Sequence, residues 1–232
     1  MIIGDFLKAL GQIGDARFRR VLGLGIGLTF ALLFAIYAIF VTALGLFFPD
    51  TVSLPWIGEV TWVDNVISWA SIPVMIVLSV FLMVPVASAF TGIFLEQVAD
   101  AVEDRHYPHL ADVPGTSLAD GFRDSLAFLG ILVVANIAAF ALYLLFPPFA
   151  PFIFWGMNGF LLGREYFQLV AMRRLGRDRA RKLRARHSLT IWLAGGLMAV
   201  PLTFPLINLF VPVLGAATFT HLFHRLEGTS AP

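Results

Sequence analysis

The sequence predicts an all-α integral membrane protein with two long transmembrane helices and two helical hairpins that enter the bilayer only partly. Of the 232 residues, 59% are hydrophobic and 13% charged, whereas soluble domains average about 45–50% and about 25%. A soluble domain of this size could not cover so much apolar surface. The uncharged residues form four long runs, and prolines interrupt the last three. We therefore treat residues 1–232 as a single membrane domain.

The first expected element is an amphipathic helix within residues 1–20. Its apolar residues recur at three- and four-residue spacing, and Asp5, Lys8 and Gln12 fall between them. This pattern is typical of a helix that lies at the membrane surface. The early acidic residues also argue against a signal peptide.

Two uncharged runs, 21–49 and 65–95, predict the transmembrane helices. About 20 apolar residues suffice to cross a bilayer, so both runs are long enough to span. A short acidic loop joins them, and prolines at 73 and 85 interrupt the second run.

The runs 125–163 and 188–220 predict the two hairpins. The Pro-rich segment 146–151 divides the first into helices of about 126–146 and about 152–172, because proline breaks a helix. Prolines at 201, 205 and 212 leave the second with arms that are too short to cross. Irregular backbone inside a bilayer must be covered by protein, so we expect a homo-oligomer.

Residues 164–186 form a basic segment. It holds nine of the chain's sixteen Lys and Arg residues. Because positive charge favours the cytoplasmic side, the segment and both termini are predicted to be cytoplasmic. The segment is expected to contact lipid head groups or another subunit. No feature besides charge suggests nucleic-acid binding, so none is expected.

A second basic motif, Arg17-Phe18-Arg19-Arg20, precedes the first span. One interpretation is a topology anchor. The other is an anion site, because a helix start offers unpaired N–H groups and guanidinium groups add paired donors. Arg17, Arg19 and Arg20 are therefore the candidate ligands of sulfate or a similar oxyanion.

Glu96, Asp100 and Glu103 lie on one face of a predicted helix, and Arg105 follows. Three stacked carboxylates repel unless they are solvated or paired. They form either a solvated face or a charged gate paired with arginines of another element. On the second interpretation, all four residues are pore or gate candidates.

No motif predicts catalysis. The chain has no Cys, no nucleotide-binding motif, no HExxH and no nucleophile elbow. His221 and His224 are three apart, which fits a polar pair better than a metal site. We expect no enzyme activity, cofactor or metal.

The sequence resembles the CysZ sulfate permeases and the related etoposide-induced membrane proteins. The likeness rests on the order and spacing of the basic motif at 17–20, the passage Pro85–Glu96, the passage Gly163–Phe167 and the two Pro-tipped hairpins. It implies the fold stated above, a bacterial inner-membrane location, homo-oligomeric assembly and sulfate uptake for cysteine synthesis.

The resemblance also assigns residues. The family's Gly-Leu-Arg-type sulfate-binding motif matches Arg19 and Arg20 with Arg17 nearby, but Phe18 replaces Leu and the Gly is missing. This departure favours a guanidinium clamp over a backbone cradle. Glu96 and Glu103 match the family's charged region. The alternative function is a non-transporting oligomeric membrane scaffold, which a sulfate-uptake measurement would separate from a permease.

Overall fold

The computed structural model describes residues 2–47, 52–54, 58–60, 94–113, 118–208 and 210–228. Helices account for nearly all of these residues, so the predicted all-α class is confirmed. The chain divides into two compact units, one of Met1–Gly23 with Ser88–Pro232 and the other of Leu24–Ala87. The predicted span 65–95 lies outside the described residues, except for Phe94 and Leu95.

The second unit contains most of helix α2, Ala16–Phe47, which begins in the first unit. The sequence of α2 is uncharged from Val21 to its end. Two short strands follow, β1 (Val52–Leu54) and β2 (Gly58–Val60), and pair antiparallel. The expected loop between the two spans therefore contains a small β-hairpin. Its outermost pair joins two β-branched residues, Val52 and Val60, which suit a strand.

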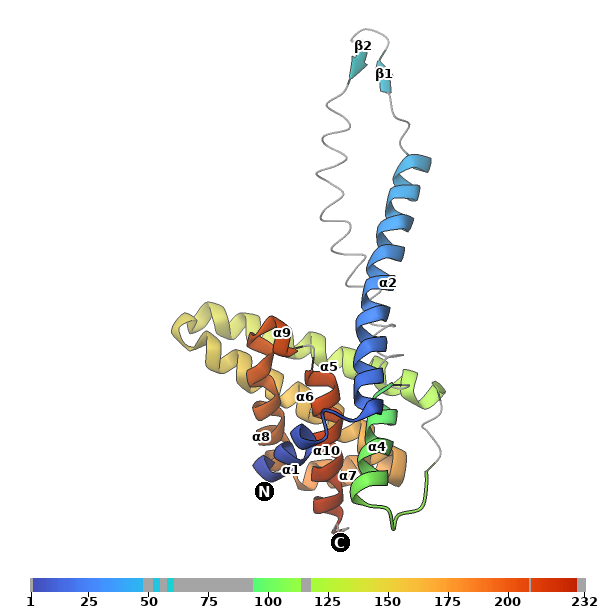
Figure 1. Cartoon of the computed structure of the whole chain (residues 1–232). Helices are drawn as coiled ribbons and strands as arrows, with labels where there is room; N and C mark the ends of the chain where they lie inside the picture. The colour runs from blue at the N-terminus through green and yellow to red at the C-terminus, as the bar shows by residue number, and fades with distance from the viewer. Residues whose placement is uncertain are drawn as a thin grey trace. The chain divides into compact units, whose positions relative to one another are not determined.

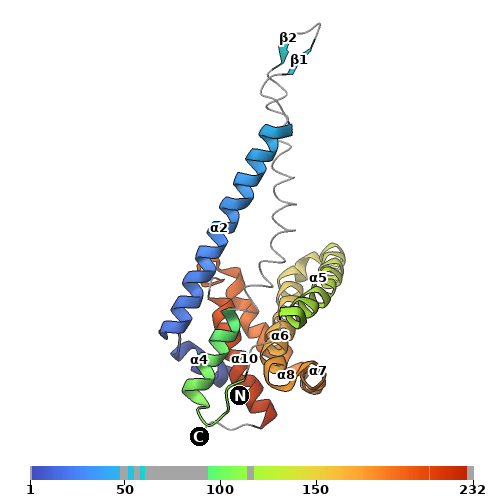
Figure 2. The ribbon, with the colours of Figure 1, turned by 90° about the vertical axis from the view of Figure 1, so that its right-hand side faces the viewer.

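Helix α10 (Val211–Glu227) forms the centre of the first unit. Helices α1 (Ile2–Gly11), α4 (Glu96–His106), α6 (Ala150–Leu175) and α8 (Ser188–Ala199) pack around it (Figures 1 and 2). All residues of α10 from Val213 to His224 are buried. The helix is thus a core element that contacts protein on every side.

The prolines between α5 (Leu118–Leu145) and α6 coincide with a helix break. Pro147 and Pro148 lack backbone N–H groups and cannot continue the helix. The chain instead forms the short 3₁₀ helix η2 (Pro147–Phe149) and turns into α6, which packs against α5. Leu126–Leu145 of α5 is long and apolar enough to cross a membrane. Its mean hydropathy is 2.4 and only 6% of it is buried.

Helices α6 and α8 pack at very close range through glycines. A Cβ atom added to Gly195 of α8 would lie 1.9 Å from the carbonyl oxygen of Gly159 in α6. Only hydrogen fits at this position. After α6, Gly176 turns the chain with a φ of 74°, a conformation that glycine adopts without strain, and α7 (Arg177–Arg186) begins. The 3₁₀ helix η3 (Val200–Thr203) and the short helix α9 (Pro205–Asn208) connect α8 to α10.

The N-terminal segment differs from the single helix expected over residues 1–20. Helix α1 ends at Gly11, and α2 starts at Ala16 after a short turn. The side of α1 that faces the protein is mixed: Asp5 and Ala9 are buried, and Ile2 and Phe6 pack against the core, while Ile3, Leu7 and Leu10 are exposed. Only the outer apolar residues of α1 are therefore available to lipid, and Asp5 has a protein partner in Arg225.

Candidate functional site

The start of α2 holds the basic motif. The Asp15 side chain caps the helix and accepts a 2.8 Å hydrogen bond from the backbone N–H of Arg17. Phe18 and Val21, one helical turn apart, are buried in the core. This spacing leaves Arg17, Arg19 and Arg20 on exposed positions of the same turn. Arg17 and Arg20, three residues apart, therefore lie on neighbouring positions of α2, whereas Arg19 lies on the side opposite Arg17. Asp15 already occupies one helix-end N–H group.

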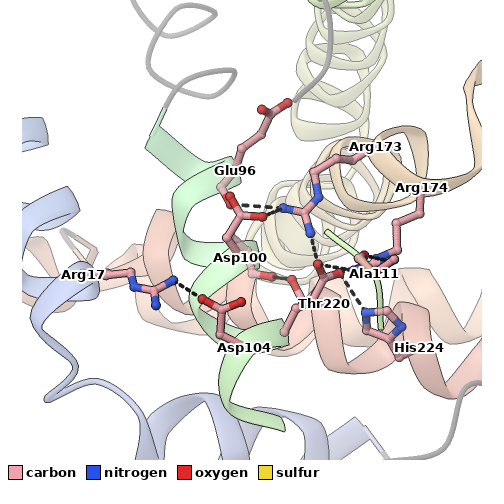
Figure 3. A network of polar contacts seen from close by, with 11 residues as sticks. Arg17, Glu96, Asp100, Asp104, Ala111, Arg173, Arg174, Thr220 and His224 are labelled. Atoms are coloured by element: carbon pink, nitrogen blue, oxygen red, sulfur yellow. Dashed lines mark hydrogen bonds and ion pairs between the residues drawn. The ribbon is translucent and has the colours of Figure 1, made fainter. Parts of the chain in front are cut away.

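The three arginines differ in their partners. Arg17 Nη1 lies 2.6 Å from Asp104 Oδ2 of α4, and both side chains are half exposed (Figure 3). The hydrogen bond from Arg17 to Asp104 is the main reason why the pKa of Arg17 is raised. Arg19 and Arg20 form no ion pair with any residue in the described ranges. They are the motif's available cations.

A buried charge cluster lies between α4, α6 and α10 (Figure 3). Glu103 at its centre contacts Arg173, Arg174 and His224. Arg174 donates from Nε and Nη2 at 2.7 and 2.6 Å, and His224 Nε2 lies 2.9 Å from Glu103 Oε1. The Arg173 and Glu103 side chains are 1% and 6% exposed. One carboxylate therefore joins three helices of the first unit.

The pKa values around Glu103 follow from these contacts. Burial alone would raise the pKa of Glu103, but hydrogen bonds from Arg174 and His224, together with the charges of Arg173 and Arg174, lower it to about 2. The neighbouring Asp100 pairs with Arg173, yet burial and the charges of Glu103 and Asp104 raise its pKa. The pKa values of the two carboxylates thus shift in opposite directions, because Glu103 accepts hydrogen bonds from more donors than Asp100 does.

Of the remaining gate candidates, Glu96 lies at the edge of the cluster and Arg105 does not contact it. The backbone oxygen of Glu96 accepts a 3.4 Å hydrogen bond from Arg173 Nη1. Arg105 is exposed and forms no ion pair with a residue that the structure describes. Asp100 and Glu103 therefore meet arginines of another helix, as the gate interpretation requires, while Arg105 lies outside the cluster.

A Tyr–His group adjoins the charge cluster. The Tyr107 hydroxyl shares a 3.1 Å hydrogen bond with His221 Nδ1, and the Tyr107 ring packs 4.2 Å from that of His224. Burial, with smaller effects from nearby positive charges, lowers the pKa of His221 to about 3. The described residues contain no His, Cys, Asp or Glu group able to hold a metal ion. His221 and His224 act here as packed polar residues.

Sequence reasoning found the acids of this cluster but not their partners. Arg173 and Arg174 fall within the predicted basic segment, yet their spacing does not distinguish them from its exposed arginines. The signal that could have distinguished Arg173 and Arg174 is their position at the end of a long apolar helix, which packs against the rest of the protein. Tyr107 has no local pattern that marks it.

A cleft of about 260 Å³ opens beside α4. Its lining includes Asp100, Asp104 and Asp112 as well as Arg174. Acidic side chains repel an oxyanion, so this cleft does not suit sulfate. The exposed arginines at the start of α2 suit it better.

Comparison with known proteins identifies a family. A family described as Sulfate transporter CysZ/Etoposide-induced protein 2.4 matches residues 5–212. This match covers most of the chain, including the start of α2, the acids of α4 and the arginines at the end of α6. No curated protein and no solved structure matches the chain.

Proposed function

Because the chain belongs to the family of the sulfate transporter CysZ and the etoposide-induced protein 2.4, a family of membrane transporters rather than enzymes, we propose that it carries sulfate across a bacterial inner membrane. The sulfate would supply cysteine synthesis. The observation that carries this proposal within the family is the exposed pair Arg19 and Arg20 at the start of α2, which lacks an ion-pair partner among the described residues.

The chemistry of sulfate fits this pair. Sulfate is a strongly hydrated dianion, and its transfer into a low-dielectric passage is unfavourable unless positive charge compensates. Guanidinium groups stay ionised and offer paired N–H donors to oxyanions. With both termini cytoplasmic, these arginines lie at the cytoplasmic edge of α2, where sulfate leaves the passage.

The buried cluster around Glu103 is the proposed gate. Asp100 and Glu103 are held by Arg173 and Arg174 at the junction of three helices. We assign the gate to these pairs because charged side chains buried along a membrane protein commonly mark ion pathways. Glu96 and Arg105 flank this gate. A homo-oligomer, with lipid around it, covers the exposed apolar surface of α5.

The decisive experiment is sulfate uptake. Vesicles containing the purified protein are compared with protein-free vesicles, using radiolabelled sulfate, and the gene is expressed in a bacterial strain that lacks its own sulfate permeases. We expect uptake above the empty vesicles and growth on sulfate. Correctly inserted protein that gives neither result would instead favour the oligomeric membrane scaffold.

A further inference from the structure

Arg17 differs from Arg19 and Arg20 because its guanidinium already holds an anion. That anion is the Asp104 carboxylate, 2.6 Å from Arg17 Nη1. Both side chains are 50% exposed, so solutes reach them. A carboxylate oxygen and a sulfate oxygen accept the same N–H donors. The two anions therefore compete for one group.

The competing carboxylate is fixed in place by the packing around it. Gln12, which is 1% exposed, donates a 2.9 Å hydrogen bond to the backbone oxygen of Ala101 in α4. Phe18 of α2 and Val102 of α4 belong to the same buried core. These contacts hold the start of α2 against α4, so Asp104 stays beside Arg17. A tethered group competes at a high effective concentration.

The surroundings of Arg17 are also negative. The charges of Asp104, Asp15 and Asp100 all raise the pKa of Arg17, in addition to the hydrogen bond from Arg17 to Asp104. An incoming oxyanion therefore meets three carboxylates near Arg17. Arg19 and Arg20 lack such a partner within the described residues.

We propose that Asp104 is a built-in competitor of the transported oxyanion. Its carboxylate occupies Arg17 in the empty protein, and an oxyanion bound at Arg20, which follows Arg17 by about one helical turn, displaces it to gain Arg17. Asp104 thereby lowers the affinity of the site and favours release. This inference rests on the proposed function, because it assumes that the three arginines bind sulfate.

The test is equilibrium binding of radiolabelled sulfate to the purified full chain. The variants are Asp104→Asn, Arg17→Ala and the double variant. The matched control is Asp112→Asn, which removes an exposed carboxylate of the same segment that has no ion pair with a described residue. We expect Asp104→Asn to bind sulfate about twofold to fivefold more tightly, the range expected for loss of an exposed ion pair. Asp112→Asn should change affinity by much less.

The double variant separates a contact from a general charge effect. In the Arg17→Ala background, Asp104→Asn should leave the affinity unchanged, because the contested guanidinium is absent. Tightening that persists in this background, or that equals the effect of Asp112→Asn, would overturn the proposal.

Two outcomes distinguish this proposal from the function on which it rests. If the wild type binds sulfate and Asp104→Asn binds it equally well, only the role of Asp104 as a competitor is refuted. If neither protein binds sulfate and vesicle uptake is also absent, both proposals are wrong. All variants are first checked for an unchanged elution profile in detergent.

Discussion

Arg19 and Arg20 provide the most direct test at the scale of single residues. Charged hydrogen bonds contribute roughly 1.5–3 kcal/mol each. Loss of one such bond corresponds to about a tenfold to hundredfold weaker affinity. We therefore expect Arg19→Ala with Arg20→Ala to weaken sulfate binding by at least about tenfold. Lys at both positions should restore part of the affinity, because it keeps the positive charge but lacks the paired N–H donors of a guanidinium group.

The matched control for this double variant is Arg179→Ala with Arg181→Ala in α7, which removes two exposed arginines elsewhere. It should bind sulfate nearly as well as the wild type. Equal affinities of the wild type and the Arg19/Arg20 variant, with normal insertion, would reduce the motif to a topology anchor.

Glu103 gives a second prediction, concerning stability. Glu103→Gln removes the charge that faces the buried Arg173, and breaking a buried pair is strongly destabilising. We expect a loss on the order of 3 kcal/mol, measured by thermal unfolding in detergent. Asp112→Asn, at an exposed position, should change stability little.

The same contacts predict that the protein loses folding stability at acidic pH. Because the pKa of Glu103 falls from 4.5 to about 2 on folding, its stabilisation is complete above about pH 4.5. It is lost as the pH falls from there toward 2. The wild type should lose more stability over this interval than Glu103→Gln. Parallel acid curves for the two proteins would contradict the assigned network.

At the residue scale, the sequence indicates types of contact better than partners. The spacing of Glu96, Asp100 and Glu103 predicts a shared helix face. Whether that face meets water or arginines depends on the packing of α6 against α4, which no local pattern encodes. Asp5 shows the same limit, since its burial follows from Arg225, 220 positions away.

At the scale of helices, the crossing of α6 and α8 allows a sharp comparison between adjacent glycines. A Cβ at Gly195 would clash with the Gly159 carbonyl, whereas a Cβ at Gly196 would meet nothing within 4 Å. We expect Gly195→Ala to destabilise by about 1–3 kcal/mol, because the helices must separate. Gly196→Ala should be neutral or slightly stabilising, since Ala favours a helix. Equal melting temperatures would contradict this packing.

Helix boundaries were predictable where the chain carries its own stop signal. Proline at 147 and 148 marks the turn between α5 and α6, since proline cannot continue the helical hydrogen bonds. The break between α1 and α2 was missed because a regular spacing of apolar residues continues past Gly11. The hydrophobic run at α10 indicated a membrane-inserted arm, but apolar residues suit a protein core and lipid equally well.

The basic segment predicts the orientation of the whole molecule. Arg179 in α7 is exposed, and the chain has no native Cys, so Arg179→Cys provides a single label. An impermeant thiol reagent should label it in inside-out vesicles and not in intact cells. Labelling of intact cells would refute the cytoplasmic assignment.

The assembly prediction follows from uncovered apolar surface. Val134, Ile137 and Phe140 of α5 are at least 63% exposed, and turns within a bilayer need protein cover. We expect the purified protein to be oligomeric in detergent, measured by light scattering. A monomer that still transports sulfate would contradict this prediction.

The pairing of Asp5 with Arg225 has a consequence for biosynthesis. Helix α1 is made early, yet its buried carboxylate finds its partner on α10, the last described helix. At a synthesis rate of about 5–20 residues per second, the delay is on the order of tens of seconds. During this interval the Asp5 carboxylate must remain hydrated or be shielded by a chaperone. A ribosome stalled before α10 would therefore leave the first helix attached to a nascent chain whose core is still missing.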